Sequence, residues 1–78
     1  MLNDRNAKVL VRKDLYPDGA NFPTYHTEYE CACGKGRVIE ERVAGFNDWW
    51  AKIKCRWCSR KYELEEGCGY IWAFKEKD

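Results

Sequence analysis

The sequence predicts a small, mainly-β domain with an antiparallel sheet of about 4-5 short strands. Its 78 residues suffice for one domain with a thin apolar core, because a chain of this length buries only about 60% of the surface that its unfolded form exposes. Several segments alternate between apolar and polar residues, as strands with one buried face do. No stretch of ten or more residues repeats its apolar side chains at helical spacing.

The first half of the chain contains two predicted strands separated by a loop. Residues 8–15 are rich in valine and leucine, and residues 24–31 alternate strictly. Residues 16–24 contain both prolines together with Asp, Gly and Asn, and therefore form the loop. One face of the second strand carries Tyr25, Thr27, Tyr29 and Cys31.

The second half contains the remaining predicted strands. Residues 36–43 form a strand, residues 44–49 form a turn, and residues 49–55 alternate again. The inward face of that last segment carries Trp49, Ala51, Ile53 and Cys55. A short strand is predicted at 61–64. The run at 70–74 is apolar on both faces, so we expect it to be a central or covered strand rather than an edge strand.

Four of the five cysteines are arranged as two close pairs. The first pair is Cys31-x-Cys33, and after 21 intervening residues the second is Cys55-x2-Cys58. Each pair lies at a predicted strand end beside glycine or serine. Four soft thiolates at about 2.3 Å from a common centre suit tetrahedral zinc. We therefore predict one structural Zn²⁺ held by Cys31, Cys33, Cys55 and Cys58.

Other roles for the thiols fit the pattern less well. A redox pair at Cys55 and Cys58 needs a helix within a βαβ unit, which no segment predicts. The odd number of cysteines disfavours a closed disulfide set, and iron is a minor alternative. A catalytic zinc site keeps an open position, whereas four cysteines close the shell. Cys68 is interpreted as a small, semi-buried turn residue and His26 as a surface residue.

The segments "CACGKG" and "CRWCSRKY" resemble the two knuckles of the zinc-ribbon, or rubredoxin-knuckle, group of small bacterial and phage proteins. The resemblance covers roughly residues 29–74 and implies two knuckles around a β-hairpin. The first knuckle is one residue shorter than the common Cys-x2-Cys-Gly form, which leaves Cys68 or His26 as alternatives to Cys31 as the fourth ligand. We expect a single domain over residues 1–78, with the ribbon core at about 29–74 and the strand and loop of 1–28 packed on it.

Charge is distributed unevenly along the chain. The net charge is +1, yet residues 33–61 carry eight basic and three acidic side chains, whereas residues 62–78 carry two basic and five acidic ones. The first 19 residues mix both signs and contain no long apolar run, so we expect no signal peptide or membrane span there and a cytoplasmic location.

A candidate binding face combines basic and aromatic side chains that strand alternation and the second knuckle direct outward. Its members are Trp50, Lys52, Lys54, Arg56, Trp57, Arg60 and Lys61. Such a face suits nucleic acid, through phosphate contacts and base stacking, and equally a protein interface, where Trp and Arg are frequent anchors. Alternatively, Trp49 and Trp50 both belong to the core and the lysines form a solvated face.

The sequence favours a non-enzymatic zinc-ribbon module that docks on a protein or nucleoprotein partner, such as a phage-type accessory or inhibitor protein. The alternative is a nucleic-acid-binding ribbon. Domains that bind nucleic acid commonly have an isoelectric point above about 9, whereas that of this chain is about 7.6. We expect no catalytic residues, no small-molecule substrate and no membrane partner. The adjacent pairs Glu40-Glu41 and Glu65-Glu66 point to opposite faces of a strand and so do not predict a catalytic dyad.

Overall fold

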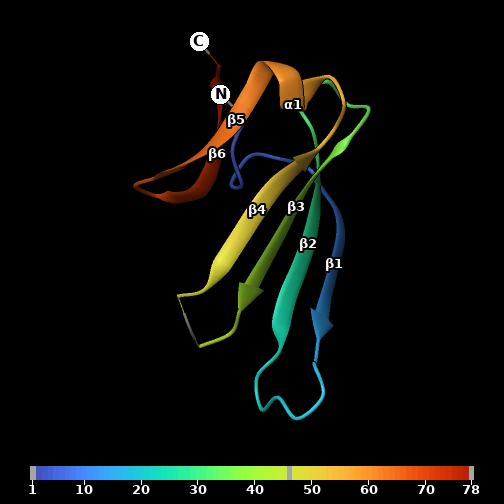
Figure 1. Ribbon diagram of the computed structural model, residues 1–78, viewed down its shortest axis with the longest axis vertical. Coiled ribbons are helices and arrows are strands. Elements are labelled where there is room, and N and C mark those ends of the chain that lie inside the picture. The colour runs from blue at the N-terminus through green and yellow to red at the C-terminus, as the bar shows by residue number, and fades with distance from the viewer. Residues whose placement is uncertain (1, 46, 78) are drawn as a thin grey trace.

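The computed structural model describes residues 2–45 and 47–77, and this part of the chain forms six strands and one short helix (Figure 1). In chain order the elements are β1 (Val9–Leu15), β2 (Thr24–Glu30), β3 (Arg37–Val43), β4 (Trp49–Lys54), α1 (Cys58–Lys61), β5 (Tyr62–Gly67) and β6 (Tyr70–Glu76). The predicted class, a small mainly-β fold with antiparallel sheets, is confirmed. The main sheet has four strands, and β5 and β6 form a separate two-stranded sheet.

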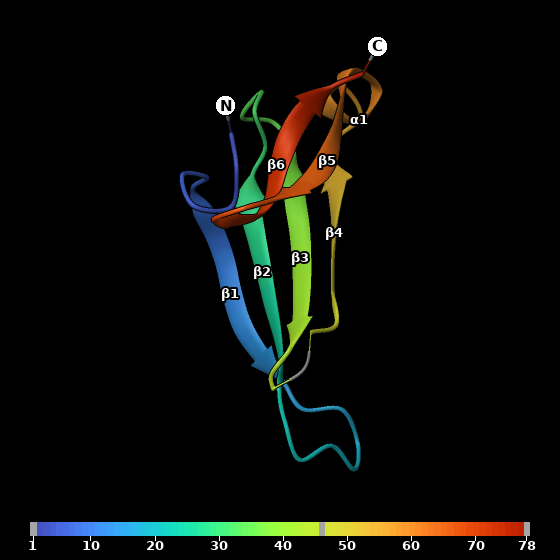
Figure 2. The same ribbon diagram turned by 90° about the vertical axis from the view of Figure 1, so that its left-hand side faces the viewer.

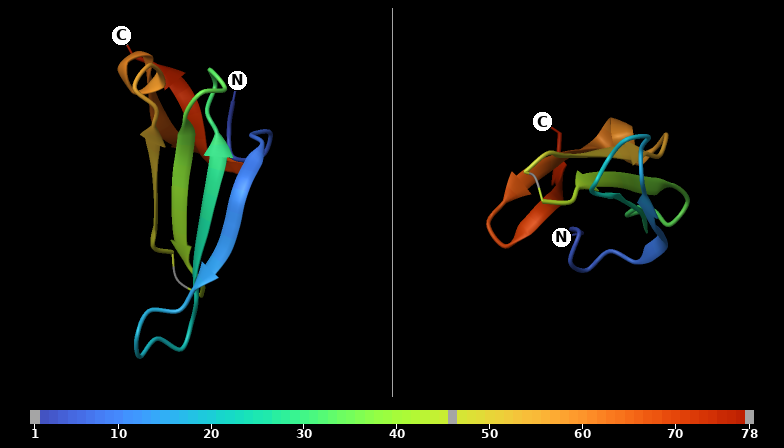
Figure 3. Two further views of the ribbon diagram at one scale, coloured as in Figure 1. Left: turned by 90° about the vertical axis from the view of Figure 1, so that its right-hand side faces the viewer. Right: turned by 90° about the horizontal axis from the view of Figure 1, so that it is seen from below.

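Strands β1 to β4 form one antiparallel sheet in sequence order, seen side by side in Figure 3. Register pairs Thr27 with Glu40 and Glu40 with Ala51. Since side chains alternate across a strand, the sheet has an inner and an outer face. The inner face carries Thr27, Tyr29, Val38 and Glu40. The outer face carries His26, Glu28, Glu41 and Lys52. The four inner residues are all buried. In β4 burial alternates as the sequence predicts, with the odd-numbered positions partly buried and the even-numbered ones exposed.

The β5–β6 hairpin lies across one end of the inner face and contributes Trp72 and Phe74 to the core (Figure 2). Trp72 and Val38 are fully buried, and the Trp72 ring meets the Tyr29 ring edge to face, with centroids 5.2 Å apart. Burial of these rings is the main apolar contribution to folding in a chain this small.

Strand β6 is covered on both sides, as its apolar run predicts. It pairs with β5 along one edge. Along the other edge the N-terminal segment bonds to it, through Asp4 N–H to the Trp72 carbonyl at 3.1 Å and Phe74 N–H to the Leu2 carbonyl at 2.8 Å. The N-terminal segment therefore closes the hairpin's open edge.

The opposite end of the four-stranded sheet carries the 16–23 loop, which extends away from the hairpin (Figures 1 and 2). The predicted turn at 44–49 also lies at this end and includes Phe46, which is outside the described residues. The predicted domain boundaries stay a prediction. Within the described residues, no helix is both long and apolar enough to cross a membrane.

Candidate metal centre

The register of the sheet brings the two cysteine pairs to one end, hereafter the cysteine end. Glu30 at the end of β2 pairs with Arg37, and Arg37 pairs with Lys54 at the end of β4. The residues that follow, Cys31 and Cys55, therefore leave the sheet at the same edge.

The four sulfurs form a tight cluster. All four Sγ atoms of Cys31, Cys33, Cys55 and Cys58 lie within 4.8 Å of one another. The nearest separations are 3.0 Å (Cys31 to Cys58), 3.2 Å (Cys31 to Cys33) and 3.4 Å (Cys33 to Cys55). None is disulfide-bonded. Sulfurs at about 2.3 Å from a tetrahedral metal are about 3.8 Å apart, a separation within this range. The cluster could therefore hold a metal ion.

The first knuckle is shaped by its two glycines. Gly34 adopts a φ of +77° and donates its N–H to the Cys31 carbonyl at 2.9 Å. This turn aims the Lys35 N–H at the Cys33 sulfur, 3.4 Å away. A Cβ atom at Gly36 would overlap the Cys55 Cβ and lie 2.9 Å from the Cys55 Cα. Only glycine thus lets the two knuckles approach this closely.

The second knuckle continues directly into α1, which the sequence did not predict. Ser59 N–H donates to the Cys55 carbonyl at 2.9 Å, and Arg60 N–H donates to the Trp57 carbonyl at 3.3 Å. Cys58 is buried at the start of the helix. A helix of four residues is too short to show a periodic pattern in the sequence.

The thiols differ in how readily they ionise. The Lys35 N–H, aided by the neighbouring thiols, lowers the pKa of Cys33 to about 6. Burial raises the pKa of both Cys31 and Cys58. Because a thiolate is the ligand form, binding of a metal ion must displace protons from Cys31 and Cys58.

Neither alternative fourth ligand lies in the cluster. Cys68 is exposed in the turn between β5 and β6, so its prediction as a semi-buried residue is wrong: Gly67 and Gly69 beside it offer no side chain to cover it. His26 lies on the outer face, as its position in β2 predicts. Its side chain is only 12% exposed, however, because Glu28 and Glu41 flank it, and its prediction as an ordinary surface residue needs that correction.

His26 is the centre of a polar row across the outer face. Its Nε2 and Nδ1 atoms each lie 2.8 Å from a carboxylate oxygen, of Glu28 and Glu41 respectively. Arg37 Nη1 donates to the other Glu28 oxygen at 2.6 Å. These hydrogen bonds, from Glu28 first and Glu41 second, raise the pKa of His26. The His26 and Arg37 hydrogen bonds lower the pKa of Glu28.

All seven residues of the predicted binding face are exposed; they are Trp50, Lys52, Lys54, Arg56, Trp57, Arg60 and Lys61. Trp57 is 60% exposed and Trp50 is 47% exposed. Trp49 packs against the core from the inner face. The alternative that both Trp49 and Trp50 are core residues is therefore wrong for Trp50. The Arg56 guanidinium lies 5.8 Å from the Trp57 ring centroid, within cation–π range.

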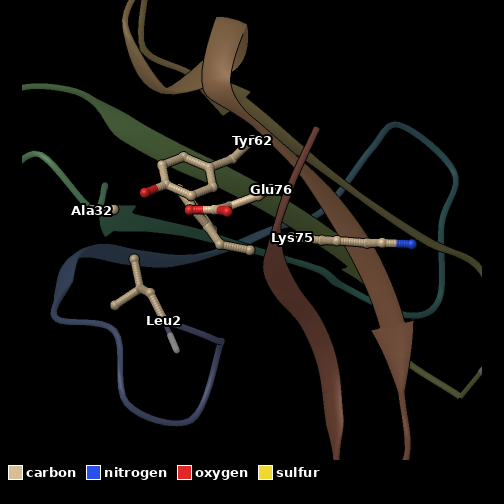
Figure 4. Close-up of a pocket in the computed structure, with 6 residues that line it drawn as sticks. Leu2, Ala32, Tyr62, Lys75 and Glu76 are labelled. Carbon is tan, nitrogen blue, oxygen red and sulfur yellow. The ribbon is translucent and has the colours of Figure 1, made fainter. Parts of the chain in front are cut away.

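An apolar groove that the sequence did not predict adjoins the knuckles. One cavity of about 470 Å³ is lined by Leu2, Ala32, Tyr62, Phe74, Lys75 and Glu76. In Figure 4, Leu2, Ala32 and Tyr62 surround it, and the Lys75 ammonium points away from them. A cavity of about 270 Å³ shares Ala32 and Tyr62 with it and reaches Trp57. The groove thus leads from the N-terminal segment to the exposed tryptophan.

A buried carboxyl group ties the hairpin to the sheet. Glu40 Oε1 accepts hydrogen bonds from Trp72 Nε1 at 3.1 Å and from the Tyr29 hydroxyl at 3.5 Å. Burial raises the pKa of Glu40, and burial together with the Glu40 charge raises the pKa of Tyr29 to about 12. The sequence shows Glu40 only as one of several charged residues in a strand.

Comparison with known proteins finds no matching family model, no matching curated protein and no matching solved structure.

Proposed function

We propose that the four cysteines hold one structural zinc ion and that the protein is a non-enzymatic binding module. Four thiolates are the donor set of structural zinc sites, and they leave no coordination position for water or substrate. The ion would join the loop after β2 to the segment between β4 and β5. The role of the ion is thus to stabilise the folded knuckles, and the binding function belongs to the side chains that the knuckles expose.

The observation that carries the proposal is the position of Trp57. It stands between two cysteines of the cluster, where metal binding would fix its backbone, yet 60% of it is exposed. A large aromatic ring on a rigid support, beside an arginine, is typical of the anchor residues of protein interfaces. The apolar groove at Ala32 and Tyr62 continues from it. We infer that a partner protein docks on Trp57 and this groove.

Charge favours a protein over a nucleic acid. Four thiolates around Zn²⁺ carry excess negative charge, which the cations of the second knuckle would offset. The acidic side chains of residues 62–78 would repel phosphates but could face a basic groove of a protein. An accessory or inhibitor protein that blocks a nucleic-acid-handling machine, of the kind known from phages, is the narrower form of this proposal.

Nucleic-acid binding is the second candidate, and the exposure of all seven basic and aromatic residues favours it. In that case Lys52, Lys54 and the knuckle cations would contact phosphates, and Trp50 and Trp57 would stack on bases.

A pull-down with and without nuclease tests both candidates. The metal-loaded wild type is compared with the Arg56→Ala/Trp57→Ala double variant, and with Trp50→Ala as a matched control that removes an exposed tryptophan outside the knuckle. A protein partner that survives nuclease treatment, is lost with the double variant and is kept by Trp50→Ala supports the docking proposal. Partners lost on nuclease treatment favour the second candidate. A double variant that retains every partner contradicts the assignment to the knuckle.

A further inference from the structure

A separate cavity lies on the inner face of the four-stranded sheet and shares no lining residue with the groove beside the knuckles. Its volume is about 380 Å³, within the range of about 300–1,000 Å³ that small-molecule sites occupy. Ile71 of β6 borders it, so the hairpin forms one wall. The other lining residues come from β1, β2 and β3 and are Arg12, Asp14, Tyr25, Thr27, Tyr29, Glu40 and Arg42.

Two buried polar groups open into this cavity. Thr27 is 5% exposed, and its hydroxyl makes no hydrogen bond within the described residues. Glu40 is 6% exposed, and both of its hydrogen bonds end on Oε1. No side-chain oxygen or nitrogen in the described chain is both fully enclosed and unpartnered. Thr27 and Glu40 both line the cavity, and we infer that the Thr27 hydroxyl and the Glu40 Oε2 atom are accessible from it with unused hydrogen-bonding capacity.

The charged residues around the cavity alternate in sign. Register places Arg12, Thr27 and Glu40 in one row across the sheet. It places Asp14, Tyr25 and Arg42 in the next row. Positive and negative side chains thus alternate both along β1 and β3 and across the sheet.

Among residues 2–45 and 47–77, no close ion pair joins these charges to one another, although burial raises the pKa of Glu40 and the Arg42 charge acts to lower it. The ion pairs of the described residues join His26, Glu28, Glu41 and Arg37 on the outer face. The four charged residues of the cavity are Arg12, Asp14, Glu40 and Arg42. Within the described part of the chain, none of them has an oppositely charged side-chain atom within 4.0 Å. The hydrogen bond that anchors Trp72 uses only the Oε1 atom of Glu40. That anchoring role therefore explains neither the presence of the second oxygen, Oε2, nor that of the two arginines.

We propose that this cavity binds the α-ammonium and α-carboxylate groups of a free amino acid or a short peptide. The carboxylate would be held by Arg42 or Arg12, whose planar guanidinium groups form two parallel hydrogen bonds with such a group. The Thr27 hydroxyl would donate to the same carboxylate. The ammonium would donate to Glu40 Oε2 and Asp14. An ion of a single sign leaves half of the cavity's charges unmatched, so a ligand that carries both signs is favoured.

The test follows the amide NMR signals of Thr27, Arg42 and Ile71 in the metal-loaded full chain during titration. The probes are glycine, glycylglycine, N-acetylglycine, which keeps only the carboxylate, and glycinamide, which keeps only the ammonium. We expect saturable shifts with glycine or glycylglycine, and the tighter of the two identifies the source. Each blocked probe loses charge-assisted hydrogen bonds and should bind about tenfold more weakly or worse.

Variants complete the test. Arg42→Gln and, as a second variant at an edge strand, Arg12→Gln should each weaken binding of the better zwitterion about tenfold. Lys13→Gln removes an exposed cation from the outer face, where Lys13 pairs with His26, and should leave binding unchanged. Circular dichroism and the thermal midpoint verify the fold of each variant. Absence of shifts with both zwitterions overturns the site. If N-acetylglycine binds as tightly as the zwitterions, the cavity is a plain anion site and the zwitterion proposal is overturned. If Lys13→Gln weakens binding as much as the arginine variants do, the effect is one of net charge and the assignment to the cavity is overturned.

Discussion

The two ends of the four-stranded sheet are stabilised by different interactions. At the cysteine end, Trp72, Val38 and Phe74 are buried in one cluster with the thiols of Cys31, Cys55 and Cys58. At the far end, residues 16–22 are all exposed, and strand pairing with polar side chains holds the structure. A chain of this size cannot build a core along its whole length. It concentrates apolar burial at one end, where a metal can supplement it, and changes at the two ends should therefore differ in cost.

Removal of the metal should have the largest effect. Structural zinc typically contributes about 10–16 kcal/mol of apparent binding free energy, comparable to the whole stability of a domain at about 5–15 kcal/mol. We expect elemental analysis to give about one zinc per chain, and a strong chelator to abolish cooperative thermal unfolding. Cys33→Ser and Cys58→Ser should do the same.

The matched control is Cys68→Ser, because Cys68 is exposed and outside the cluster. It should leave zinc content and thermal midpoint unchanged. A fold that survives chelation unaltered, or a Cys68→Ser variant that loses zinc, would contradict the assigned centre and with it the contrast between the two ends.

Gly36→Ala should have the next largest effect. The new Cβ would lie 2.7 Å from the Cys55 sulfur and 2.9 Å from its Cα, so the knuckles must separate. We expect destabilisation of about 3 kcal/mol, the upper end of the usual cost of overpacking, together with weaker zinc retention in a chelator competition.

A glycine at the far end provides the comparison for Gly36. Gly19 has a φ of +77° but no atom within 4 Å of an added Cβ. Gly19→Ala should therefore cost only the strain of its backbone, about 1–2 kcal/mol, and should keep full zinc affinity. Equal zinc loss in both variants would show that backbone strain, rather than contact between the knuckles, explains the effect.

The sequence predicts what local patterns determine. The spacing of the cysteines identifies the cluster, and the alternation of β4 separates Trp49 from Trp50 because the side-chain period of a strand is two residues. The contact of Gly36 with Cys55 and the hydrogen bond from Trp72 to Glu40 join residues far apart in the chain. They depend on how the hairpin folds over the sheet, which no local period encodes. For the same reason the groove and the inner-face cavity could not be predicted.

Glu40→Ala tests how the hairpin is attached to the sheet. Loss of the Glu40 carboxylate leaves the Trp72 N–H and the Tyr29 hydroxyl without their acceptor. Each unsatisfied buried donor costs about 1–3 kcal/mol of stability. We expect a loss of about 2 kcal/mol or more by urea unfolding of the metal-loaded protein. Glu40→Gln retains a carbonyl acceptor and should cost less. If Glu41→Ala, the neighbouring change on the outer face, costs as much as Glu40→Ala, the buried acceptor is not what anchors the hairpin.

The smallest loss of stability should come from a change in the polar row on the outer face, which is centred on His26. This loss should depend on pH, which distinguishes it from the effects of the substitutions above. The pKa of His26 is raised from 6.5, so its stabilisation is complete below about pH 6.5 and fades as pH rises through the folded-state pKa. The pKa of Glu28 is lowered from 4.5, so its contribution is present above about pH 4.5 and is lost as pH falls through the folded-state value.

We therefore expect the thermal midpoint of His26→Gln to fall below that of wild type by a few degrees, most strongly between about pH 4.5 and pH 6.5. The quantity to compare is the difference in thermal midpoint between wild type and His26→Gln at each pH, because protonation of the thiolates affects both proteins alike. It should narrow above neutral pH as wild-type His26 loses its proton. A difference that is constant from pH 5 to pH 9 would mean that His26 stabilises the far half of the sheet by packing alone, without charge.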